Sequence, residues 1–145
     1  MRVVITGARE LARDLDRGGR RLPSAVEKAV RLASELLVGA AQREMQGSRT
    51  RAIRLGRAIT ARPGVLGIDY GRLRQSMSYT VERRGRLIRG EVGPRVVYAR
   101  IHELGGVAGR GARIPRRPYL APAIKKTASK ILKLLGRAFS VVPGA

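Results

Sequence analysis

One stretch of the chain predicts a long amphipathic helix more clearly than any other part predicts its structure. Apolar residues recur at three- and four-residue intervals from Val26 to Ala41, which is the 3.6-residue period of a helix with one buried face. Ser24 and Glu27 have the spacing of a capping box, and Gly47 suits the residue just past a helix end. We therefore expect a helix from about Ser24 to Gln46, whose apolar stripe other elements must cover.

A second amphipathic helix is expected near the C-terminus, from Ala123 to Phe139. Its apolar positions include Ile124, Ile131 and Leu135, while most of its lysines fall on the opposite side. The N-terminal residues Met1–Ile5 read as a short strand. A short helix starting at Thr6 or Gly7 would follow and stop at Gly18-Gly19.

Strict alternation predicts an antiparallel hairpin in the middle of the chain. Met77, Tyr79 and Val81 alternate with polar residues, and Ile88 and Val92 share one face after Gly85. The turn is expected near Arg84-Gly85-Arg86. This hairpin would form the small sheet on which the helices pack.

The remaining segments carry weaker signals. Residues 96–104 fit a short helix or a strand, and Gly105–Arg113 reads as a mobile glycine-rich loop. Ile114–Ala123 should be extended because Pro115, Pro118 and Pro122 disfavour a helix. The basic segment at about 47–68 is either a long loop or an inserted hairpin.

Together these elements predict one α+β domain over residues 1–145. The long N-terminal helix and the C-terminal helix would pack on a small antiparallel sheet, with the basic insertion at about 47–68. A sheet this small leaves strand edges exposed, and exposed edges are pairing surfaces unless they are covered. The pattern therefore favours an oligomer.

Composition argues against an enzyme and against bound cofactors. The chain has no cysteine and a single histidine, His102, so a thiol nucleophile and a Cys- or His-rich metal site are excluded. No Gly-x-Ser-x-Gly elbow is present, and the cluster Gly105, Gly106, Gly109, Gly111 lacks the Gly-Lys-Ser/Thr of a phosphate-binding loop. No apolar run reaches the roughly 18 residues that span a bilayer. We expect a soluble protein that is not exported, with neither metal nor cofactor.

The charge balance points to a polyanionic partner. Among 145 residues, 31 Lys and Arg face 10 Asp and Glu, giving a formal net charge of +21. Such a charge attracts nucleic acid or an acidic protein surface. Aromatic residues make up only 3% of the chain, so contact with nucleic acid would use phosphates without reading sequence. A solvated surface produced by biased codon usage is the alternative interpretation.

Three motifs, in this order and spacing, resemble one family. They are Asp69-Tyr70-Gly71-Arg72-Leu73-Arg74-Gln75-Ser76-Met77, Tyr98-Ala99-Arg100-Ile101-His102-Glu103-Leu104-Gly105-Gly106, and Ile114-Pro115-Arg116-Arg117-Pro118-Tyr119-Leu120-Ala121-Pro122-Ala123. The chain resembles the virion morphogenesis, or tail-completion, proteins of tailed bacteriophages. It departs from the family pattern at Tyr70, Leu104, Arg116 and Tyr119, where Thr, Phe, Ala and Phe are commoner.

The resemblance implies a non-enzymatic virion protein of the phage neck, assembled in the host cytoplasm. Such proteins form a ring, commonly a hexamer, that completes the tail and joins it to the head connector. The implied partners are further copies of the chain, neighbouring head-connector and tail proteins, and double-stranded DNA in the lumen, with no membrane. A tail terminator, a head-closure ring protein and a basic nucleic-acid-binding module without sequence specificity are the alternatives.

Two sets of residues are the candidate sites. The segment Arg117-Pro118-Tyr119-Leu120, which we call the proline arm, combines a backbone restricted by proline, an arginine and two apolar side chains. This combination is typical of a protein interface. The predicted subunit or partner interface is Tyr98, His102, Glu103, Leu104, Pro115, Arg117, Pro118, Tyr119 and Leu120. Tyr98, Leu104 and Leu120 fit core positions equally well. The predicted contacts with DNA or an adjacent ring are Arg49, Arg51, Arg54, Arg57 and Arg62.

Overall fold

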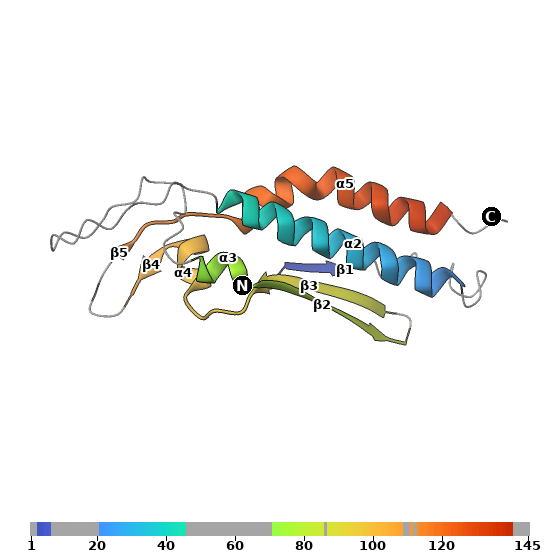
Figure 1. Ribbon diagram of the computed structural model, residues 1–145, viewed down its shortest axis with the longest axis horizontal. Helices are drawn as coiled ribbons and strands as arrows, with labels where there is room; N and C mark the ends of the chain where they lie inside the picture. The colour runs from blue at the N-terminus through green and yellow to red at the C-terminus, as the bar shows by residue number, and fades with distance from the viewer. Residues whose placement is uncertain are drawn as a thin grey trace.

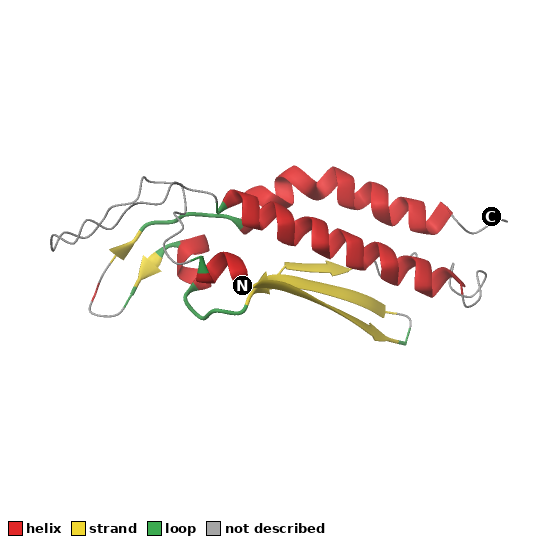
Figure 2. Cartoon of the chain, in the orientation of Figure 1, coloured by secondary structure: helices red, strands yellow, loops and turns green. Residues whose placement is uncertain are grey.

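A computed structural model describes residues 3–6, 21–45, 71–85, 87–108, 111 and 113–140 (Figure 1). The elements, in chain order, are β1 (Val3–Thr6), α2 (Arg21–Glu44), α3 (Arg72–Gln75), β2 (Met77–Arg84), β3 (Leu87–Pro94), α4 (Ala99–Leu104), β4 (Gly106–Val107), β5 (Arg113–Ile114) and α5 (Leu120–Ser140). Two long helices lie beside a small antiparallel sheet, with the short elements at one end (Figure 2). This arrangement confirms the predicted α+β class.

The main sheet has three strands in the order β1-β3-β2, and both pairings are antiparallel. The hairpin pairs Met77 with Pro94 at its open end and Arg84 with Leu87 next to the turn. Gly85 takes φ 58° there, a left-handed conformation that glycine adopts without strain. The predicted hairpin and its turn are confirmed, and β1 confirms the predicted N-terminal strand over its described residues.

α2 packs across the inner face of this sheet at unusually short range. A Cβ at Gly90 of β3 would lie 2.8 Å from the Ser34 hydroxyl and 2.9 Å from a Val30 methyl. Gly90 takes the inward position between Ile88 and Val92, both of which are buried. The alternation of β3 is imperfect in the sequence because this inward position is occupied by helix α2 instead of by a side chain.

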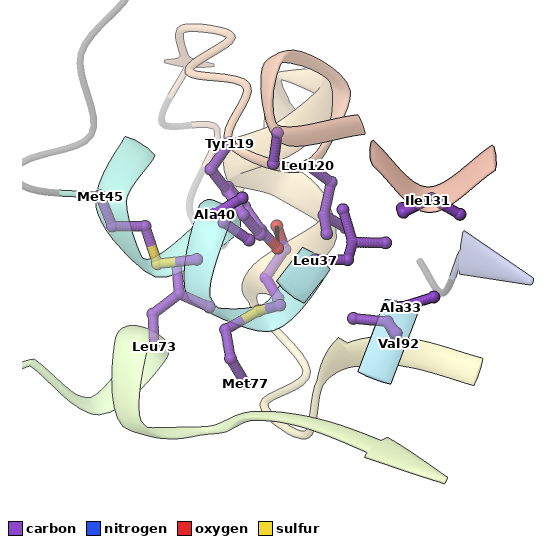
Figure 3. Close-up of a cluster of buried hydrophobic side chains, with 13 residues drawn as sticks. Ala33, Leu37, Ala40, Met45, Leu73, Met77, Val92, Tyr119, Leu120 and Ile131 are labelled. Carbon is purple, nitrogen blue, oxygen red and sulfur yellow. Dashed lines mark hydrogen bonds between the residues drawn. The ribbon is translucent and has the colours of Figure 1, made fainter. Parts of the chain in front are cut away.

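α5 lies along the other side of α2, so that α2 separates α5 from most of the sheet (Figure 1). The core between these layers gathers Leu37 of α2, Met45 directly after α2, Val92 of β3, and Leu120 and Ile131 of α5 (Figure 3). A second cluster, at the other end of the helix pair, joins Val26 and Val30 to Ile88 and Ala138. The C-terminal helix therefore packs chiefly on the long helix and only marginally on the sheet.

Both long helices start earlier than the sequence predicted. α2 begins at Arg21, so Ser24 lies inside its first turn and is not the residue that precedes the helix. α5 begins at Leu120 and includes Pro122, which the prediction placed in an extended segment. Proline is tolerated in the first turn of a helix, where its missing N–H has no intrahelical acceptor.

Two predicted segments lie outside the described residues. They are the short helix from Thr6 or Gly7 to Gly18-Gly19, of which at most Thr6 is described, and the basic insertion at about 47–68. Arg49, Arg51, Arg54, Arg57 and Arg62 belong to the second of these.

Candidate assembly site

The second and third sequence motifs meet at the carboxylate of Glu103. This side chain of α4 accepts hydrogen bonds from the backbone N–H groups of Tyr119 (2.7 Å), Leu120 (2.9 Å) and Ala121 (3.0 Å). The first N–H groups of a helix have no intrahelical acceptor, and a negative charge complements the helix dipole there. Glu103 is only 1% exposed. It therefore caps α5 from a different element of the fold.

Tyr119, directly before α5, also connects this junction to α4. Its ring is completely buried, and its hydroxyl donates a long hydrogen bond of 3.4 Å to the carbonyl of Ala99 in α4. Burial, reinforced by the nearby carboxylate of Glu103, raises the pKa of the Tyr119 phenol far above its ordinary value of 10.0. The phenol stays protonated and able to donate throughout the physiological range.

A glycine turn closes the platform formed by α4, the proline arm and the start of α5. Gly105 has φ 74°, and a Cβ there would lie 3.1 Å from the backbone nitrogen of Arg116. The Arg117 N–H donates to the His102 carbonyl at 2.7 Å, which joins the arm to the end of α4. The predicted mobile loop after Gly105 is wrong at its base, because β4 and β5 pair there as a two-stranded ribbon.

His102 lies at the edge of this platform. Its ring meets the ring of Tyr98 edge to face, with centroids 5.9 Å apart. Burial, and secondarily the positive charge of Arg117, lowers the pKa of His102 below its ordinary value of 6.5. Its Nδ1 atom is buried and has no hydrogen-bond partner within the described part of the chain. The imidazole is therefore neutral at pH 7.

The first motif is structural as far as it is described. Gly71 takes φ 70° directly before α3, Leu73 is buried, and the Ser76 hydroxyl donates to the Leu73 carbonyl at 2.8 Å. Gln42 of α2 donates to the Arg74 carbonyl at 3.2 Å. These contacts attach the start of β2 to the long helix.

The structure divides the predicted interface residues into two groups. The side chains of Glu103, Tyr119 and Leu120 are buried within the single chain and do not form part of its exposed surface. Their burial follows from the capping of α5, which draws the start of the helix into the core. Tyr98, Leu104 and Pro115 are exposed, while His102, Arg117 and Pro118 are half-buried. Of the three residues that also fitted core positions, Leu120 is a core residue, whereas Tyr98 and Leu104 are exposed.

The sequence analysis missed two exposed apolar residues next to this platform. Val97 is 97% exposed and Val107 is 66% exposed, and Leu104 between them is 47% exposed. Together with Arg100, Ile101, Gly105 and Gly106 they line a shallow hollow of about 420 Å³. We call this surface the α4–β4 hollow. An exposed apolar patch of this kind commonly marks a contact surface.

The charges of the described residues are strongly unbalanced. Glu27, Glu44, Glu82 and Glu91 each form an ion pair with Arg or Lys. Glu35 accepts the Tyr79 hydroxyl at 2.7 Å, which raises the pKa of that phenol above its ordinary value. α5 carries no acidic residue, and its cations are Lys125, Lys126, Lys130, Lys133 and Arg137.

Neither a metal-binding cluster nor a membrane-spanning helix is found in the described ranges. No group of three or more His, Asp or Glu side chains that could hold a metal occurs in them. No helix in the same ranges is both long enough and apolar enough to cross a membrane.

Comparison with known proteins identifies the chain by family. No curated protein and no solved structure matches it. The model of the phage virion morphogenesis family matches residues 8–140, which includes all three motifs and both long helices. The glutamate cap, the glycine turn and the proline arm are the structural content of two of those motifs. The chain belongs to the phage virion morphogenesis family.

Proposed function

We propose that this protein is a structural component of the phage neck. Copies of the chain form a ring of six that completes the tail and joins it to the head connector, and DNA passes through the lumen. The observation that carries the proposal is the exposed apolar surface at Val97, Leu104 and Val107, mounted on the rigid platform of α4 and the arm. An assembly protein needs complementary surfaces and no reacting groups.

Subunit contacts in this ring are proposed at the sheet edges and at the exposed part of the arm. β1 and β2 are the outer strands of the three-stranded sheet, so each leaves one row of backbone groups without a strand partner in that sheet. Tyr98, in the second motif, and Pro115, in the third, are exposed. Identical copies that meet head to tail through such surfaces close into a ring when the rotation between them permits.

The mass of the purified particle tests the ring. We expect native mass spectrometry to give a closed oligomer, with Arg117→Ala and Tyr98→Ala shifting it toward the monomer while circular dichroism stays unchanged. Leu132→Ala is the control, since Leu132 is exposed on α5, away from the arm. A particle that remains monomeric at high concentration, and that binds DNA with a steep salt dependence, would instead favour the basic nucleic-acid-binding module.

The basic insertion is proposed to contact an adjacent ring or DNA. Deletion of Arg49–Arg62 should impair the joining of heads to tails more than it impairs folding. Loss of folded protein on this deletion would show that the segment belongs to the core instead. Tail termination and head closure remain the alternative positions within the neck, and labelling the protein in intact virions separates them.

A further inference from the structure

We propose that the α4–β4 hollow binds an acidic, amphipathic segment of a neighbouring virion protein and not a second copy of this chain. The inference rests on the proposed function, because it names the kind of partner that one surface of the neck protein takes. The apolar floor of the hollow and the sign of the charges around it carry the argument.

The floor of the hollow is built to receive apolar side chains. Val97, Leu104 and Val107 expose large fractions of their surface, and Ile101 lies between them as a partly buried residue. The platform beneath is held by the Glu103 cap and by the Arg117 N–H bond to the His102 carbonyl. A rigid floor reduces the entropy lost when a partner docks.

The rim of the hollow is cationic. Arg100 lines it directly. Arg113 is paired with Val107 across the β4–β5 ribbon, and directly paired residues project from the same face. Arg116 is exposed, and its backbone nitrogen is adjacent to Gly105 at the base of the ribbon. A segment that lays apolar side chains on the floor therefore meets guanidinium groups at its flanks.

Within the described ranges, few acidic side chains of this chain are available to pair with the cationic rim. After Glu91, the only acidic residue in the sequence is Glu103, which is buried and occupied by three N–H groups of α5. Of the other described acids, Glu27 pairs with Arg31, Glu82 pairs with Arg84, and Glu35 accepts the Tyr79 hydroxyl. A second copy would bring mostly positive charge, and like charges across an interface disfavour it. Carboxylates from a different protein complement the rim and speed encounter.

Site-specific photo-crosslinking in assembled particles tests the proposal. Val97 is replaced by p-benzoyl-phenylalanine, with the same replacement at Leu132 as the control, because both side chains are exposed and apolar. We expect position 97 to crosslink to a different virion protein, within a segment whose apolar residues are flanked by Asp or Glu, and position 132 to leave that segment unlabelled. Crosslinks from position 97 to the same chain, to a segment without net negative charge, or to nothing would overturn the proposal.

A binding measurement makes the electrostatic part quantitative. The captured segment is synthesised as a peptide and titrated against the full chain. We expect Arg100→Glu combined with Arg116→Glu to weaken binding at least tenfold, whereas Arg72→Glu combined with Arg83→Glu, at exposed sites on α3 and β2, has little effect. Equal losses in both double variants would contradict a localised site.

The two proposals can fail separately. A closed ring whose hollow crosslinks only to its own copies would keep the neck function and reject the acidic partner. A protein that forms no ring, but whose hollow captures an acidic segment elsewhere in the virion, would do the reverse.

Discussion

The junction of α4 and α5 is held by hydrogen bonds from one buried polar side chain, that of Glu103, in a chain whose described residues bury few polar side chains. Glu103 supplies the oxygens that three successive N–H groups need, and the sequence places it between His102 and Leu104 of a short helix. A buried donor left without an acceptor costs about 1–3 kcal/mol. The attachment of the start of α5 to α4 therefore depends on one carboxylate.

Glu103→Gln should lower the free energy of unfolding by about 1–3 kcal/mol, because one acceptor oxygen becomes an NH₂ donor that faces other donors. The measurement is the midpoint of urea denaturation, with Glu82→Gln as the control. Glu82 is exposed and pairs only with Arg84, so that variant should stay within about 0.5 kcal/mol of the wild type. Equal stability of the two variants would show that the cap is dispensable.

His102 gives a second prediction at this scale, because it is the only histidine in the chain. Its pKa is lowered in the folded protein by burial and then by Arg117, so the unfolded chain binds a proton more readily. Stability should therefore be complete above pH 6.5 and should decline as the pH falls from 6.5 toward the folded pKa. The single imidazole resonance in an NMR titration reports that pKa directly, and a value at or above 6.5 would contradict this environment.

At the scale of elements, the fold depends on how closely α2 approaches β3. Val30 and Ser34 occupy the space over Gly90, so a side chain at that position cannot be added without moving the helix or the strand. Gly136 of α5 is the opposite case, since nothing lies within 4 Å of a Cβ built there and its φ is not in the left-handed region. Substitution by alanine is therefore expected to have opposite effects on stability at these two glycines.

Gly90→Ala should destabilise the protein by about 1–3 kcal/mol, the usual cost of overpacking a core. Gly136→Ala should stabilise it by about 0.5–1 kcal/mol, because alanine restricts the unfolded chain and favours helix. Thermal unfolding of both variants, each compared with the wild type, measures the two effects. If Gly90→Ala were neutral, the close approach of α2 to the sheet would be wrong.

The same elements show what could be predicted from the sequence. Periodicity located α2, α5 and the β2–β3 hairpin, because each buries one continuous face whose spacing is local information. The start of α2 was misjudged because Ser24 and Glu27 have the spacing of a capping box, although Ser24 lies inside the first turn. The start of α5 was misjudged because Pro122 disfavours a helix interior but lies in the first turn. The role of Glu103 was missed, because its three partners lie 16 to 18 residues away and are brought to it only by tertiary structure. The exposure of Val97 and Val107 left no local signal, since valine at either position would read as an ordinary buried residue.

For the whole molecule, the surplus of positive charge is the dominant long-range property. The formal net charge is +21, and α5 contributes cations with no acid of its own. Lys125, Lys130 and Lys133 are exposed along it. A polyanion neutralised by such groups releases bound counterions, so its affinity falls with salt in proportion to the number of contacts. If DNA in the proposed lumen contacts α5, the exposed lysines of this helix should contribute a predictable part of the salt dependence of DNA binding.

The triple variant Lys125→Gln, Lys130→Gln, Lys133→Gln should reduce the slope of log affinity against log salt by about 2.7, because each phosphate contact contributes about 0.9 for duplex DNA. Fluorescence anisotropy with a short duplex at several salt concentrations gives the slope. The control is Lys28→Gln, Arg43→Gln, Arg72→Gln, which removes the same charge from exposed positions on α2 and α3. A slope change confined to the first variant would place DNA against α5. Equal changes in both would mean that DNA responds only to the overall charge, and the lumen would then need a different lining.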